Sequence, residues 1–193
     1  MKEIVNCISR LETAAERVKN YGIEIKRMIM TGEGVQFLPT ELETIDSQVC
    51  ETIRGLSDNY QFFLDGSKFF TSQLYTIYTH IIGKKKRVDP VTKEVRYLYY
   101  TDNGVYCSFY NAVKVTKEPI NPICIPTHGD LKEGKFISTI FGPTCDSIDC
   151  LGDKFELPEM EIGDWFKFEN HGYKCSSYST NFNGFEDPDV IIM

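Results

Sequence analysis

Apolar residues near the start of the chain recur first with a helical period and then with a strand period. Residues 4–18 carry apolar side chains at steps of three and four, which predicts an amphipathic helix that ends before Gly22. Residues 23–30 alternate between apolar and polar side chains and then become fully apolar. This pattern predicts a buried strand that ends in the glycine-bearing turn at 31–34.

A second helix and a second strand are expected in the residues that follow. Thr40 and Glu43 form a capping box, and apolar residues at helical spacing continue from there to Leu56. The apolar run at 60–64 then leads into a turn that contains glycine. The order helix, strand, helix, strand is typical of a parallel α/β fold, so we expect residues 1–80 to form a fraction of an α/β barrel.

The pattern changes after these residues. The lysine-rich run at 84–87, with Asp89-Pro90 beside it, predicts a hairpin tip on a solvated sheet edge. From Tyr97 onward, short segments rich in Tyr, Phe, Val and Ile alternate with Gly and Pro, which is typical of antiparallel sheets. We therefore expect a second, antiparallel β domain over residues 81–193.

Composition and charge argue against several classes of protein. The 193 residues are 41% hydrophobic and 25% charged, close to a soluble globular average, and no apolar run approaches a membrane span of ~18 residues. The net charge of −7 disfavours a nucleic-acid-binding protein, whose surface must neutralise phosphates. Residues 1–10 are amphipathic and predict no signal peptide. Seven cysteines, an odd number in apolar contexts, favour reduced thiols and a cytoplasmic location.

The strongest candidate for a functional site is a loop with the sequence Gly142-Pro143-Thr144-Cys145-Asp146. Gly-Pro forms a rigid turn, and such a turn places the thiol of Cys145 and the carboxylate of Asp146 at a loop tip. Cys145 and Cys150 have a C-x4-C spacing, but without a second matching pair they predict no metal site.

Motifs in the second part of the chain follow one another in a recognisable order: Asn103-Gly104-Val105-Tyr106-Cys107-Ser108-Phe109, Gly142-Pro143-Thr144-Cys145-Asp146, Leu157-Pro158-Glu159-Met160, Gly163-Asp164-Trp165, Phe168-Glu169-Asn170 and Phe182-Asn183-Gly184-Phe185. They resemble the C-terminal β domain of ornithine decarboxylase and of its relatives that decarboxylate arginine or diaminopimelate. The first motif resembles a strand of that family. The resemblance implies the last units of a (β/α) barrel that binds pyridoxal phosphate (PLP), followed by an antiparallel β-sandwich or barrel-like domain. It is weaker over the first 70 residues.

The resemblance also implies an obligate head-to-tail dimer in which each active site takes a loop from the neighbouring subunit. In that family the cysteine of the loop returns a proton to the substrate after decarboxylation, and the aspartate holds the distal amine of the substrate. Cys145 and Asp146 match these two positions. The partner is either a second copy of the chain or a full-length decarboxylase.

The residues that the resemblance assigns to PLP have changed. The glycine-rich phosphate turn of the family corresponds to Gly32 and Gly34, with a glutamate between them that opposes a phosphate dianion. Asp65 and Lys68 match the acid and the arginine of a second cofactor-binding turn, and Lys174 stands where a tyrosine contacts the phosphate. These changes weaken the expected binding of PLP by this chain.

Two further departures concern the substrate and the covalent cofactor link. Lys114-Val115 stands where the family has Tyr-Asp to receive the distal ammonium of the substrate, and a lysine repels an ammonium. No lysine of the sequence matches the family motif for the lysine that binds PLP covalently.

The resemblance therefore implies an ornithine decarboxylase-like protein of putrescine synthesis that lacks activity of its own. An alternative is a non-catalytic partner that pairs with a full-length decarboxylase and either donates the Cys145-Asp146 loop or sequesters a subunit. A third reading is a piece of an active enzyme whose lysine lies upstream of Met1. A role like that of the antizyme-binding regulators is disfavoured, because their antizyme-binding surface precedes the part of the family that this sequence resembles.

Overall fold

The computed structural model describes most of the second half of the chain and parts of the first: residues 2–30, 51, 54–55, 59–64, 71, 74–116, 119–172 and 178–192. The chain divides into two compact units, residues 1–71 and 72–193. The division expected between residues 80 and 81 would cut strand β3 (Ile77–Val88), which lies wholly in the second unit. The boundary therefore precedes this strand.

The first unit begins with helix α1 (Lys2–Lys19), as its apolar period predicts. The side chains of Ile8 and Ala15, on the predicted stripe, are buried. Gly22 has a φ of +79°, a conformation that favours glycine, and its N–H donates to the carbonyl of Lys19 at 3.0 Å. None of the helices in the described ranges has the length and apolar character needed to span a bilayer.

Two short strands complete the described part of the first unit. β1 (Arg27–Met30) and β2 (Gln61–Leu64) pair in parallel, which confirms the expected strand direction. Met28 and Tyr60 are buried with Ala15 in a small core. The helix expected from Thr40 to Leu56 lies almost entirely outside the described residues.

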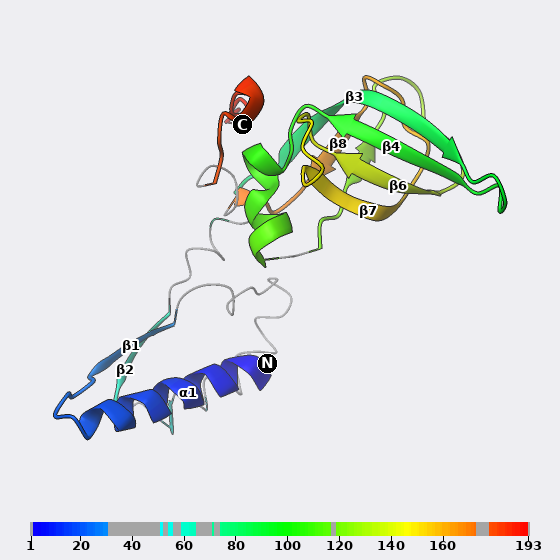
Figure 1. Ribbon diagram of the computed structural model, residues 1–193. Helices are drawn as coiled ribbons and strands as arrows, with labels where there is room; N and C mark the ends of the chain where they lie inside the picture. Colours follow the sequence, from blue (N-terminus) through cyan, green and yellow to red (C-terminus); the bar gives the residue numbers. More distant parts are fainter. Residues whose placement is uncertain are drawn as a thin grey trace. The chain divides into compact units, whose positions relative to one another are not determined.

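The second unit contains a curled sheet of six strands in the order β5-β8-β3-β4-β6-β7 (Figure 1). Besides β3, its strands are β4 (Val95–Thr101), β5 (Ile123–Ile125), β6 (Phe136–Phe141), β7 (Cys150–Leu157) and β8 (Trp165–Phe168). Four neighbouring pairs are antiparallel, and β4 and β6 pair in parallel. The sheet is thus mixed, because the chain makes a long crossover between β4 and β6 that lets both strands run the same way.

The predicted hairpin joins β3 and β4. The lysine-rich run belongs to β3, and the turn begins after it, at Asp89. The Asp89 carboxylate accepts hydrogen bonds from the backbone N–H groups of Val91 and Thr92, both at 2.8 Å. These backbone donors lower the pKa of Asp89 and close the turn.

Aromatic side chains dominate the core of the second unit. Tyr97 and Tyr99 of β4 stack at 5.9 Å between ring centroids, and Tyr99 meets Phe166 of β8 edge to face at 5.7 Å. Each such buried side chain contributes about 1.5–3 kcal/mol through removal from water. The buried cluster comprises Ile77, Ile81, Tyr97, Tyr99, Phe109, Ala112, Ile120, Ile140, Leu151, Leu157, Met160, Phe166 and Phe168.

The segment after β4 is helical, so the strand expected at 103–109 is wrong. It forms wide turns in η2 (Val105–Phe109) and η3 (Asn111–Thr116). The N–H of Phe109 donates to the carbonyl of Gly104, five residues back, at 3.1 Å. Phe109 and Ala112 are three residues apart in this helical segment, so their side chains lie on the same face, and both are buried against the sheet. The ring of Phe109 packs against that of Phe168, with 4.8 Å between their centroids.

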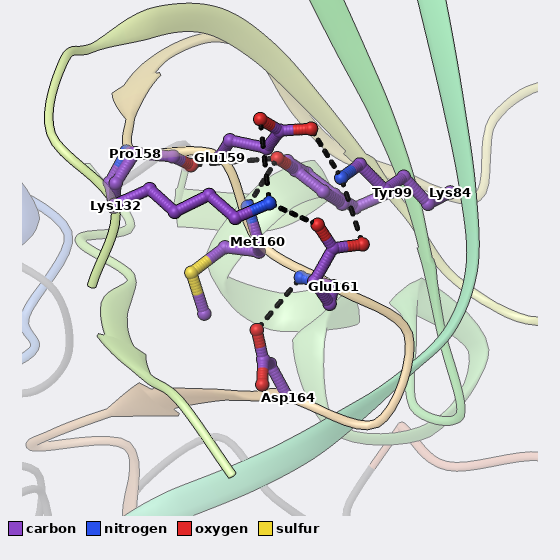
Figure 2. A network of polar contacts seen from close by, with 8 residues as sticks. All are labelled: Lys84, Tyr99, Lys132, Pro158, Glu159, Met160, Glu161 and Asp164. Carbon is purple, nitrogen blue, oxygen red and sulfur yellow. Dashed lines mark hydrogen bonds and ion pairs between the residues drawn. The ribbon is translucent and has the colours of Figure 1, made fainter. Parts of the chain in front are cut away.

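An ion-pair network fixes the loop between β7 and β8 to the sheet (Figure 2). Lys84 of β3 lies 2.7 Å from a carboxylate oxygen of Glu159 and 3.1 Å from one of Glu161. Lys132 pairs with the same two glutamates. The hydrogen bond from Lys84, and Coulombic attraction to both lysines, lower the pKa of Glu159 to about 2.

Candidate functional site

The Cys145-Asp146 loop connects β6 to β7. Its ends are closed by two backbone hydrogen bonds, from Gly142 N–H to the carbonyl of Asp149 at 2.9 Å and from Asp149 N–H to the carbonyl of Asp146 at 3.0 Å. The side chain of Cys145 is exposed and that of Asp146 is half-buried. The structure therefore places both predicted side chains on a closed surface loop.

The carboxylate of Asp146 is held by two donors. Its Oδ1 accepts the backbone N–H of Ile148 at 3.0 Å, and its Oδ2 accepts the hydroxyl of Tyr106 at 2.6 Å. The Ile148 hydrogen bond, followed by the Tyr106 hydrogen bond and a smaller attraction to Lys114, lowers the pKa of Asp146. The hydrogen bond between Tyr106 and Asp146 also raises the pKa of Tyr106 to about 12. Asp146 is therefore ionised and Tyr106 neutral at physiological pH.

The C-terminal segment packs against the same loop. The ring of Phe182 lies 4.4 Å from the ring of Tyr106, and the N–H of Thr180 donates to the carbonyl of Tyr106 at 2.9 Å. The side-chain amide of Asn183 donates to Cys145 Sγ at 3.6 Å. Asn183 has a φ of +58°, a conformation that asparagine tolerates better than most residues. These contacts join residues that lie far apart in the sequence.

Sequence reasoning identified Cys145 and Asp146 but missed the roles of Tyr106 and Asn183. Both residues lie in motifs that carry the family resemblance. Their contacts with the loop span 40 and 38 positions of the chain, and no local pattern encodes such contacts.

The other cysteines with described environments differ from Cys145. The structure shows free thiols at Cys107, Cys124, Cys145 and Cys150. Burial raises the pKa of Cys107, Cys150 and Cys124, the last to about 11. These three therefore stay protonated and poorly nucleophilic, whereas Cys145 is the exposed thiol of the four.

The predicted PLP-binding residues Gly32, Gly34, Asp65, Lys68 and Lys174 all lie outside the described residues. Their role in binding PLP therefore stays a prediction. Within the described ranges, no group of three or more His, Cys, Asp or Glu side chains could hold a metal ion.

A known family model matches more than half of the chain. Residues 68–172 match the C-terminal sheet domain of the pyridoxal-dependent decarboxylases that act on ornithine, diaminopimelate and arginine. The chain belongs to this family. The matched range contains β3 to β8 and the Cys145-Asp146 loop.

Curated relatives include ornithine decarboxylases and an antizyme inhibitor. The ornithine decarboxylase of Caenorhabditis elegans is 33% identical over 156 residues, which cover 73% of this chain and 36% of that protein. The ornithine decarboxylase of Cricetulus griseus is 32% identical over 128 residues, which cover 64% of this chain and 28% of that protein. Antizyme inhibitor 2 of Xenopus laevis is 29% identical over 140 residues, covering 69% and 30%. The chain thus spans about a third of the length of these relatives.

Solved structures show that the fold extends over nearly the whole chain. The arginine decarboxylase of Paramecium bursaria Chlorella virus matches with a TM-score of 0.72 at 24% identity, over 96% of this chain and 48% of that one. The lysine/ornithine decarboxylase of Vibrio vulnificus, solved with cadaverine, matches with a TM-score of 0.65 at 21% identity, over 96% and 49%. The predicted fold class, the end of a barrel followed by a β domain, is therefore confirmed.

Proposed function

We propose that this chain acts in trans with a full-length ornithine decarboxylase in putrescine synthesis. It donates the Cys145-Asp146 loop to the active site of that partner and has no decarboxylase activity alone. The observation that carries the proposal is the pairing of an exposed thiol with an adjacent carboxylate that two hydrogen bonds hold in its ionised form.

The chemistry of the two side chains suits this task. Cys145 gives its S–H proton to the substrate carbon that has lost CO₂, and the thiolate then recovers a proton from water. Asp146, ionised at neutral pH, attracts the distal ammonium group of ornithine or putrescine. Both groups lie on a surface loop, so a partner subunit can reach them.

The changed residues support the lack of independent activity. Lys114 lies in η3 and its positive charge acts on Asp146 of the same chain, where the family has a tyrosine. At its own site the chain has Val115 in place of the carboxylate that receives the distal ammonium in the family. In the proposed complex, PLP and its covalent lysine belong to the full-length partner. The free thiols agree with a reducing compartment, and we place the complex in the cytoplasm.

The test is complementation between two inactive proteins. The C. elegans enzyme, with alanine at the position that aligns with Cys145, is mixed with this chain and putrescine formation is measured. We expect the wild-type chain to restore turnover and the Cys145→Ala chain to restore none. Addition of stoichiometric PLP to the chain alone, followed by borohydride, should label no single lysine selectively. Equal turnover with both chains would reject donation of the thiol.

Sequestration of a subunit is the second candidate function. Its support is that one relative, antizyme inhibitor 2, 29% identical over 140 residues, carries the name of an inhibitor and not of a decarboxylase. Sequestration needs binding but no thiol. It therefore predicts that wild-type and Cys145→Ala chains lower the activity of an unmodified C. elegans enzyme equally, with the loss saturating at one chain per subunit.

A further inference from the structure

Asp149 lies at the end of the loop, three residues after Asp146, and its side chain is only 1% exposed. Its carboxylate accepts three hydrogen bonds. Oδ1 accepts the backbone N–H of Val105 at 2.7 Å, and Oδ2 accepts the backbone N–H of Thr144 at 3.0 Å and its hydroxyl at 2.7 Å. One buried carboxylate therefore joins the loop to the start of η2.

Two glycines make room for this carboxylate. A Cβ atom on Gly104 or on Gly142 would overlap Oδ1 of Asp149, so only glycine fits at either position. Asp149 forms no ion pair with the described residues, and hydrogen bonds must offset the cost of burying its charge. Because the Asp149 carboxylate is enclosed and accepts three hydrogen bonds, it holds the backbone at Val105 and at Thr144 in place.

The two segments that Asp149 joins each lead directly to a functional group. Thr144 immediately precedes Cys145, and Val105 immediately precedes Tyr106, whose hydroxyl holds Asp146. We propose that Asp149 is the positioning residue that sets Cys145 and Asp146 in register with Tyr106. This inference rests on the proposed function, because it assigns Asp149 a part in preparing the donated loop.

The test compares Asp149→Asn with wild type. Asparagine has nearly the same shape, but its amide nitrogen cannot accept a hydrogen bond, so one of the two segments loses its acceptor. Asp153→Asn is the matched control, since Asp153 lies exposed on β7. Amide exchange of Val105 and Thr144, measured by NMR on the full chain, should rise roughly 10-fold in Asp149→Asn, with amides of β3 and β4 unchanged.

Complementation supplies the functional readout. At saturating chain concentration, kcat of the mixture with the alanine-substituted C. elegans enzyme should fall about 10-fold or more with Asp149→Asn, because a small misplacement of a reacting group slows the chemical step. Asp153→Asn should leave kcat unchanged. The double variant Cys145→Ala/Asp149→Asn should be no slower than Cys145→Ala alone, since Asp149 acts through the thiol.

Several outcomes would overturn the inference. Unchanged exchange at Val105 and Thr144, or unchanged kcat despite faster exchange, would show that Asp149 does not position the loop. If Asp149→Asn does not fold, Thr144→Val, which removes only the hydroxyl donor, should shift both readouts in the same direction by a smaller factor; no shift rejects the inference. If the wild-type chain restores no turnover, the proposed function fails, and the exchange data still decide whether Asp149 joins the two segments.

Discussion

At the scale of single residues, one short hydrogen bond of 2.6 Å couples Tyr106 to Asp146. The bond favours the charged form of Asp146 and the neutral form of Tyr106, and this is why the two pKa values move apart. Phe182 covers one face of the Tyr106 ring and so helps to hold the hydroxyl in place. The negative charge of the loop therefore depends on a residue that lies outside the loop.

Replacement of Tyr106 by Phe should weaken substrate binding in the complementation assay more than it slows turnover. Loss of the hydroxyl removes one of the two donors to Asp146, so the carboxylate is less firmly oriented toward an ammonium. A charge-assisted hydrogen bond is worth about 1.5–3 kcal/mol, and we expect the KM for ornithine to rise about 10-fold, with kcat changed less than threefold.

Tyr110→Phe is the matched control for this experiment. Its ring stacks on Tyr178 at 5.5 Å, and it belongs to the same helical segment as Tyr106. KM should stay unchanged in that variant. An unchanged KM with Tyr106→Phe as well would mean that Asp146 does not hold the substrate amine.

The position of Cys145 and Asp146 on a loop could be predicted from the sequence, whereas their environment could not. Cys145 and Asp146 stand in a short motif whose Gly-Pro turn predicts a loop, and the structure has that loop. The contacts from Tyr106 and Asn183 depend on how the C-terminal segment and η2 fold back onto it. Such long-range contacts follow from tertiary packing and leave no periodic signal in the chain.

At the scale of secondary-structure elements, ion pairs attach the loop between β7 and β8 to the sheet. Lys84 is only 14% exposed and lies between Glu159 and Glu161, while the hydroxyl of Tyr99 accepts the N–H of Met160 at 3.0 Å (Figure 2). The amide of Glu161 donates to Asp164 at 2.7 Å. The loop is thus attached to β3 and β4 by side chains as well as by its flanking strands.

Lys84→Met should destabilise the chain by about 1–2 kcal/mol in urea unfolding at pH 7, between the values for exposed and buried ion pairs. The pKa of Glu159 is lowered to about 2 in the folded state. The contribution of Glu159 to the free energy of unfolding is therefore fully present above the ordinary pKa of a glutamate and is lost as the pH falls toward 2. The difference between wild type and variant should therefore shrink between about pH 4.5 and pH 2. Lys85→Met, on an exposed neighbour in the same strand, should cost less than ~0.5 kcal/mol.

Helix α1, strands β1 and β2, and the β3–β4 hairpin follow from local periodicity and turn residues. The error at 103–109 has a physical cause. Its aromatic and β-branched residues have high strand propensity, but packing of Phe109 and Ala112 onto the sheet favours a helix. The resemblance to a family motif indicated a strand here, whereas tertiary burial favours helical turns.

The molecule as a whole consists of two compact units with separate described cores. The second unit buries thirteen hydrophobic residues in one cluster, whereas the described core of the first unit has Ala15, Met28 and Tyr60. We expect the second unit to be the more stable of the two, because its described residues already bury one large continuous core and hydrophobic stabilisation grows with the apolar area buried. The family match over 68–172 falls almost entirely within it.

Urea unfolding should therefore occur in two steps, and the single tryptophan allows the steps to be separated. Trp165 lies in β8 of the second unit, so its fluorescence reports on that unit, while circular dichroism at 222 nm reports on helices, of which α1 of the first unit, with 18 residues, is the longest described. We expect the 222 nm signal to change at a lower urea concentration than the fluorescence, by about 1 M for a difference of roughly 2 kcal/mol. Addition of the full-length partner should raise the midpoint of the fluorescence transition, because binding to the folded β unit stabilises it. Coincident transitions would show instead that the two units unfold as one cooperative body.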